Sequence, residues 1–225
     1  MKANEFMKKL EQNPEYQKLQ EKKHQEKQTK ISEINEIEHP FIEILHANGF
    51  NEIKDTSDLL RLKKVDNKLR EILLQWIPKM SNKYNSQENL VRALAVANNP
   101  FDGAVLISLF DAQESTENLR WAIGNTIAST AVENISDWLE NKLTDAKQPK
   151  ENQMLVYAVI KYFDREKAKK ILSTLFEKHP LQVADAFTYI GNHYDAGFLK
   201  EKSRKFKGEA LDEINKAIKK LTQKK

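Results

Sequence analysis

The sequence contains no cysteine among its 225 residues. This absence excludes a disulfide framework, a thiolate zinc site and a cysteine nucleophile, and it fits a reducing compartment. Glycine and proline are also scarce, with six of each, so the chain has few of the turn residues that many-stranded sheets need. Glu, Lys, Gln, Leu and Ala are abundant instead and favour helix. Since no segment alternates apolar and polar residues as a strand does, the sequence predicts an all-α protein.

Long apolar runs are missing as well. The longest is AVLISLF (104–110), far shorter than the roughly 20 residues that a membrane-spanning helix needs. The N-terminal stretch MKANEFMKKLEQNPEY has basic residues but lacks the apolar segment of a secretory signal. We therefore expect a cytoplasmic protein that does not interact with a membrane.

Clusters that would perform catalysis or bind a metal are missing too. The five histidines, at positions 24, 39, 46, 179 and 193, are scattered and have no carboxylate partner at metal-ligand spacing. The sequence has neither a glycine-rich phosphate loop nor a Gly-x-Ser-x-Gly nucleophile motif. We therefore expect no metal, no cofactor and no catalytic residue, and a binding protein rather than an enzyme. Acid–base catalysis by two carboxylates across a groove stays open, although no pair stands out.

The net charge of +4 is unevenly distributed. Residues 1–40 balance eight Lys against eight Glu, residues 41–145 hold 11 basic and 15 acidic side chains, and residues 146–225 hold 18 and 10. A basic C-terminal third can attract a polyanion such as nucleic acid. The alternative is an ordinary solvated helical surface, which the prevalence of Lys over Arg favours.

Residues 1–50 are predicted to form a charged helical leader. Asn13 is a favourable N-cap and Pro14 suits a first helical turn, whereas QEKKHQEKQTK (20–30) has no apolar residue at all. An apolar stripe follows and ends near Gly49, a plausible C-terminal cap. Pro40 should kink or break this helix because it removes a backbone hydrogen bond. We expect residues 1–50 to pack as an end cap on a second region, 51–225, that ends in a basic helix.

A repeat is visible when four helical segments are aligned on Ala93, Ala122, Ala158 and Ala186, which lie 29, 36 and 28 residues apart. Positions three before, one after and four after each alanine share one helical face and are almost all apolar. The residues three before are Leu90, Leu119, Leu155 and Val183. The residues one after are Leu94, Ile123, Val159 and Phe187, and those four after are Ala97, Thr126, Tyr162 and Ile190. A period of this length is typical of solenoid arrays of helix pairs.

Two local stretches resemble the HEAT-repeat proteins, an armadillo-type family of stacked helix pairs. They are LVRALAVA (90–97) and LISLFDAQESTENLRWAIGNTI (106–127), the latter with Asp111 at the corner and Leu119-Arg120 opening the second helix. The arginine is absent from the units at 150–163 and 181–194. Over about residues 60–200, the resemblance implies a right-handed α-α superhelix, a HEAT-like solenoid of four to five helix pairs, after the long charged N-terminal helix. It also implies binding of protein or nucleic acid, without shared catalytic residues.

A second face of the aligned helices carries the candidate contacts. It comprises positions one before and three after the alanines, together with a histidine placed one turn beyond Tyr189. The candidates are Arg92, Trp121, Asn125, Tyr157, Lys161, Asp185, Tyr189 and His193. If the solenoid's concave groove presents this face, the aromatic side chains can anchor a partner. The alternative for Trp121 and Tyr157 is packing of an aromatic edge against the next helix.

The expected function is therefore a non-catalytic scaffold that binds another protein in the concave groove. The alternative is a nucleic-acid-binding protein similar to the HEAT-like DNA glycosylases. In that case Trp121, Tyr157 and Asp185 would be the candidate aromatic and acidic groups, and Lys161, Arg165 and Lys169 would contact phosphates. Gly124 lies inside a helical segment and predicts a close approach of two helices.

Overall fold

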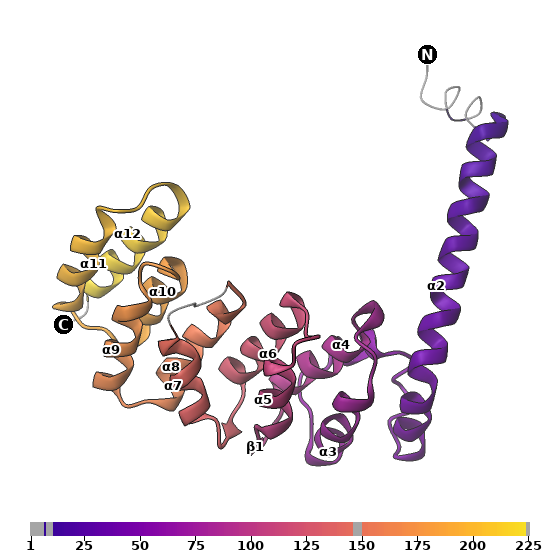
Figure 1. Ribbon diagram of the computed structural model, residues 1–225, viewed down its shortest axis with the longest axis horizontal. Helices are drawn as coiled ribbons and strands as arrows, with labels where there is room; N and C mark the ends of the chain where they lie inside the picture. Colours follow the sequence, from indigo (N-terminus) through magenta and orange to yellow (C-terminus); the bar gives the residue numbers. More distant parts are fainter. Residues whose placement is uncertain (1–6, 8–10, 146–149, 224–225) are drawn as a thin grey trace.

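The computed structural model describes residues 7, 11–145 and 150–223 and is mostly helical (Figure 1). The expected all-α class is confirmed by this content. The α-helices are α2 (Pro14–Ala47), α3 (Asn67–Trp76), α4 (Ser86–Ala93), α5 (Ala104–Asp111), α6 (Glu117–Ser129), α7 (Ser136–Thr144), α8 (Leu155–Tyr162), α9 (Arg165–Leu175), α10 (Pro180–Ile190), α11 (Asp195–Ser203) and α12 (Gly208–Thr222). The 3-10 helices are η1 (Thr56–Arg61), η2 (Ile77–Lys79), η3 (Lys83–Asn85), η4 (Leu94–Val96) and η5 (Lys150–Met154). Within the described ranges, no helix is long and apolar enough to cross a bilayer.

The helices from α3 to α12 follow one another in chain order across the molecule (Figure 1). The helices that carry the aligned alanines, together with α12, are called the alanine helices below: α4, α6, α8, α10 and α12. Each of them packs against the next, so they form a continuous row. In Figure 1, α4, α6 and α10 lie on one side of this row, and α3, α5 and α9 lie on the other. One hydrophobic core cluster runs along the whole row.

The alanine alignment predicted most of the buried face, although of the residues four after each alanine only Thr126 is fully buried. Ala93, Ala122, Ala158 and Ala186 are at most 2% exposed, because a small side chain at these positions lets the neighbouring helix come close. The residues three before and one after each alanine are buried as well. The sequence alignment missed a fifth member, Ala217 in α12, which is buried together with Ile214 and Leu221.

Two very short strands, which the sequence did not predict, join the loops of successive helices. β1 (Phe101–Asp102) and β2 (Val132–Glu133) pair in parallel, and a single bridge joins Val65 to Ala97 in the same sense. A two-residue strand is too short to show an alternating pattern. Asp102 fixes this junction, since its carboxylate accepts from the Ala104 amide at 2.8 Å and from Asn134 Nδ2 at 2.6 Å.

Helix α2 continues through Pro40 without interruption, so the expected break does not occur. The missing proline N–H would have paired with the carbonyl of Glu36, one turn earlier, and both residues lie on the exposed side of the helix. Water can therefore satisfy that carbonyl. On the opposite side, Phe41, Ile42 and Leu45 are buried and hold the last turns of the helix in place.

A buried carboxylate anchors α2 to the rest of the molecule. Glu38 is 4% exposed and accepts hydrogen bonds from the Thr56 amide at 2.8 Å, the Thr56 hydroxyl at 2.7 Å and the Ser86 hydroxyl at 2.6 Å. Its partners belong to η1 and α4, so this node joins three elements. Residues 17–30 of α2 are all exposed, and Figure 1 shows this part standing away from the row.

Two glycines mark close contacts between elements. The expected close approach at Gly124 is confirmed, because a Cβ there would lie 3.0 Å from Met154 Cβ and 3.4 Å from the Leu155 nitrogen. Gly103 is tighter still, since an added Cβ would lie 2.2 Å from Ile135 Cγ2 and 3.0 Å from the Glu133 carbonyl oxygen. The parallel strand pair therefore requires glycine at position 103.

Substitution of Gly103 should destabilise the fold more than the same change at an open position. We expect Gly103→Ala to lower the free energy of unfolding by about 1–3 kcal/mol, because the added methyl group overpacks the β1–β2 junction. In the control, Gly197→Ala in α11 places a methyl group in open space and should stabilise the helix by up to about 1 kcal/mol. Urea denaturation measures both changes. Equal stabilities of the two variants would contradict this account.

Candidate binding face

The candidate face consists of side chains that the alanine helices present in succession. It comprises Arg92 on α4, Trp121 and Asn125 on α6, Tyr157 on α8, and Asp185 and Tyr189 on α10. Because each of these helices packs against the next, the six side chains follow one another along the row. All are partly buried except Tyr189, which is 65% exposed.

At the N-terminal end of the face, a stacked cation covers an aromatic ring. The guanidinium carbon of Arg92 lies 5.0 Å from the centroid of the Trp121 ring. The same guanidinium forms a 2.7 Å ion pair with Glu88, one turn earlier on α4. The charge of Arg92 is therefore already neutralised within the protein, and the stacked contact fixes the orientation of the indole.

At the C-terminal end, tyrosine and carboxylate side chains gather. Burial raises the pKa of the Tyr157 hydroxyl, and Asp185, Tyr189 and Glu213 raise it further, because their negative charges disfavour a tyrosinate. The structure thus brings together groups from α8, α10 and α12. Glu213 was missed by the sequence alignment, although it lies four residues before the fifth aligned alanine.

Three polar groups in the middle of the face have no hydrogen-bond or ion-pair partner in the part of the chain that the structure describes. Among the described residues, neither the Asn125 amide nor the Tyr157 hydroxyl forms a hydrogen bond with another side chain or with the backbone outside its own helix. Asp185 likewise forms no ion pair within the described ranges, whereas Glu213 is paired with Lys216 at 2.5 Å. This stretch of the face therefore keeps polar groups that are half-buried and available to another molecule.

Lys161 belongs to the face by position, but its ammonium is engaged inside the protein. Its Nζ donates to the carbonyl of Thr130 at 2.8 Å and to that of Ala128 at 3.2 Å. These carbonyls lie at the C-terminal end of α6, where helical carbonyls lack internal partners and attract cations. Burial lowers the pKa of Lys161. The side chain thus joins α8 to α6.

The sequence predicted that His193 lies one helical turn beyond Tyr189. This prediction is wrong. Helix α10 ends at Ile190, and Gly191 follows in an extended conformation. The histidine is exposed in the loop before α11, with its ring centroid 3.8 Å from that of Tyr194. A Cβ at Gly191 would lie 2.5 Å from the Phe187 carbonyl oxygen, so tight packing at this turn ends the helix before His193.

The basic side chains considered for phosphate contacts are also engaged. Arg165 Nε donates to the carbonyl of Ile190 at 2.6 Å, at the C-terminal end of α10. Lys169 forms a 2.8 Å ion pair with Asp195, and both side chains are largely buried. Together with Lys161, these residues link neighbouring helices through their cationic groups.

The described residues contain no group of three or more His, Asp or Glu side chains arranged to hold a metal ion. His179 is buried between α9 and α10, and its Nε2 has no hydrogen-bond partner. Burial lowers the pKa of this histidine, with a smaller effect from Lys178. An enclosed neutral imidazole without a neighbouring nucleophile or carboxylate partner serves packing.

No protein-family model matches this chain, and no curated protein or solved structure resembles it significantly.

Removal of the Asp185 charge should lower the pKa of Tyr157. We expect Asp185→Asn to move this pKa toward the ordinary tyrosine value without reaching it, because burial of the ring remains. The NMR shift of the tyrosine ring carbon, followed against pH and assigned with Tyr157→Phe, measures the change. Asp212→Asn is the matched control, since Asp212 is exposed on α12 and does not act on Tyr157. An unchanged pKa in Asp185→Asn would show that the two side chains are not neighbours.

Proposed function

We propose that this protein is a non-catalytic scaffold that holds a protein partner on the candidate face. In this proposal the helices form a right-handed α-α superhelix, a HEAT-like solenoid whose concave side is lined by the alanine helices. The lack of cysteine is consistent with a reducing, cytoplasmic compartment.

The order and packing of the helices support the solenoid. Five successive pairs, α3–α4, α5–α6, α7–α8, α9–α10 and α11–α12, place an alanine helix second each time. In Figure 1 the row forms a shallow arc, and α2 and α12 rise at its two ends on the side of the alanine helices. The turn between α5 and α6 is fixed by Arg120, which donates to the carbonyls of Phe110 at 3.0 Å and Ala112 at 2.9 Å. The arginine of the HEAT-like stretch thus stabilises a helix pair.

The observation that carries the proposal is the unpartnered central stretch of the face. A half-buried polar group without a partner is unfavourable by about 1–3 kcal/mol when water cannot fully solvate it. Asn125, Tyr157 and Asp185 are partly buried and form no hydrogen bond or ion pair with another described side chain, and Trp121 supplies a rigid aromatic surface one turn before Asn125 on α6. Partner contacts would satisfy the polar groups and cover the aromatic ones, which is typical of energetically important interface residues.

The charges on this face favour a protein over nucleic acid. Asp185 would repel phosphates, and Arg92 is paired with Glu88. Lys161 donates to backbone carbonyls. A nucleic-acid groove needs free cationic groups along the phosphate path. An unpaired carboxylate beside tyrosine rings instead suits a partner segment that carries lysine or arginine next to an apolar side chain.

Site-specific crosslinking in cells can test this proposal. A photoreactive amino acid replaces Asn125 on the face or, as a matched control, the exposed amide Gln75 on α3. We expect a discrete protein adduct from position 125 that is absent from position 75. Asp185→Lys should reduce that adduct by about tenfold, because it reverses the charge at the centre of the site. Asp212→Lys should leave it unchanged.

The proposed site would be contradicted if positions 75 and 125 gave the same adducts. It would also be contradicted if Asp185→Lys left the amount of the adduct from position 125 unchanged. Binding to duplex DNA with a steep negative dependence on salt concentration would contradict the choice of partner, since that slope reports several phosphate contacts.

A further inference from the structure

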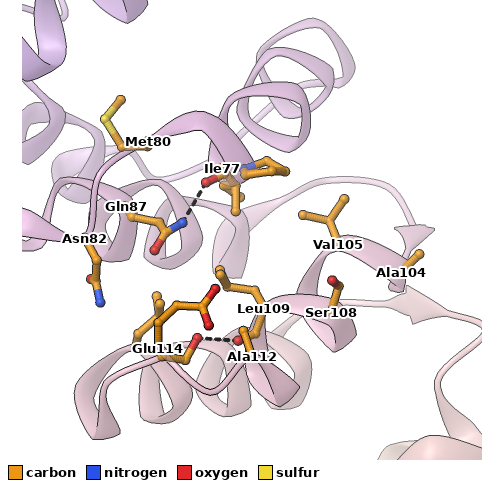
Figure 2. A pocket seen from close by; sticks show the side chains of 13 residues that line it. Ile77, Met80, Asn82, Gln87, Ala104, Val105, Ser108, Leu109, Ala112 and Glu114 are labelled. Atoms are coloured by element: carbon orange, nitrogen blue, oxygen red, sulfur yellow. Dashed lines mark hydrogen bonds between the residues drawn. The ribbon is translucent and has the colours of Figure 1, made fainter.

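A pocket of about 600 Å³ lies beside the turns that join α3 to α4 and α5 to α6 (Figure 2). Its walls come from η2 and the residues that follow it, from the first turn of α4, from α5, and from the start of α6. None of the residues of the candidate face lines it. The volume lies within the range of about 300–1,000 Å³ that is typical of small-molecule sites.

The turn between α3 and α4 leaves this space open. It spans residues 77–85, whereas the turn between α5 and α6 spans only residues 112–116. Tyr84 and Asn85 both have positive φ angles, 59° and 67°, and they turn the chain back into α4. Ile77 and Met80 on this turn are buried and face Leu109 and Leu119 across the pocket. The floor is therefore apolar.

The hydrogen-bond donors of two buried lining residues are already used inside the protein. Gln87, which is 7% exposed, donates from Nε2 to the carbonyl of Ile77 at 2.9 Å. Ser115, also 7% exposed, donates its hydroxyl hydrogen to the carbonyl of Leu109. Figure 2 shows both bonds as dashed lines at the edge of the pocket. The other uncharged polar side chains of the lining are Ser108, which is exposed, and Asn82, which donates to Thr116 Oγ1 at 3.5 Å.

Acceptors, in contrast, remain available. Within the described ranges, the Oε1 atom of Gln87 accepts no hydrogen bond, although its side chain is held in a fixed position by the Nε2 bond. Glu114 is exposed at the side of the pocket and forms no hydrogen bond or ion pair with any described residue. In Figure 2 its carboxylate is drawn beside Leu109. Glu114 is also the one ionisable side chain of the lining, so the pocket combines an apolar floor with a negative charge.

We propose that this pocket binds a small organic cation: a primary ammonium group carried on an apolar alkyl or aryl body. The ammonium donates to the Glu114 carboxylate and to Gln87 Oε1, and the apolar body packs against Ile77, Leu109 and Leu119. This arrangement gives Glu114 and Gln87 Oε1 a donor and covers the apolar floor. A carboxylate ligand would face like charge, and a neutral ligand would gain no ion pair with Glu114.

Three probes with one body and different head groups test the charge preference. They are 4-phenylbutylamine, 4-phenylbutanol and 4-phenylbutyrate, titrated into the full chain by calorimetry and by amide NMR shifts. We expect the amine to bind about tenfold more tightly than the alcohol, because a hydrogen bond to a charged group adds roughly that factor. The butyrate should bind most weakly, and the largest shifts should fall on Gln87 and Ser115.

Glu114→Gln removes the charge and keeps the shape. It should weaken the amine about tenfold and leave the alcohol unchanged, since only the ion pair is lost. Glu117→Gln is the matched control, because Glu117 lies three residues away on α6 and does not line the pocket. Ser108→Trp fills the pocket from an exposed position and should abolish binding of all three probes while circular dichroism stays unchanged.

Equal affinities for the three head groups would overturn the proposal, and so would an amine preference that survives Glu114→Gln. Failure of the amine to bind at about ten millimolar, where a pocket of this kind saturates, would overturn it as well. Asp185→Lys on the candidate face should leave amine binding unchanged, so the outcome is independent of the proposed scaffold function.

Discussion

The close approach of neighbouring alanine helices is the contact on which the rest of the structure depends. Because Ala93, Ala122, Ala158 and Ala186 expose almost no surface, larger side chains at adjacent positions can interdigitate across each junction. Thr126 adds a hydrogen bond to this packing, since its buried hydroxyl donates to the Val91 carbonyl at 2.9 Å. The apolar contacts thus set the spacing of the helices, and the polar contacts fix their relative position along the row.

Helix ends are a second shared constraint, because each leaves carbonyls without internal partners. The side chains that satisfy them come from other helices along the row. The Tyr162 hydroxyl lies 3.2 Å from the Thr130 carbonyl and accepts from the Val132 amide at 2.8 Å. Lys161 and Arg165 act similarly on α6 and α10. Several side chains that resemble ligand-binding groups in the sequence therefore stabilise the framework, and the polar groups available for binding lie between them.

The parts of this structure that could be predicted from the sequence are those governed by helical periodicity. The buried alanine face and the close approach at Gly124 follow from spacing within single helices. Periodicity does not predict contacts between loops, such as the pairing of β1 with β2, and it gives no distances between side chains far apart in the chain. The partners of Lys161, the end of α10 before His193 and the pocket at Glu114 each depend on how separate helix pairs meet. The continuity of α2 through Pro40 depends on burial on the far side of that helix.

Helix α2 has a mechanical consequence. Residues 17–30 are exposed along about 20 Å of helix, at 1.5 Å per residue, whereas the other end is fixed at Glu38 and Phe41. A rod held at one end acts as a lever: a small rotation at Glu38 becomes a large displacement at Leu19. The reverse also holds, since a force on the exposed segment produces a torque at the hydrogen bonds of Glu38 to Thr56 and Ser86. The hydrogen bonds of Glu38, together with those of Glu33 to Lys83 and Tyr84, thus hold the direction in which the arm points.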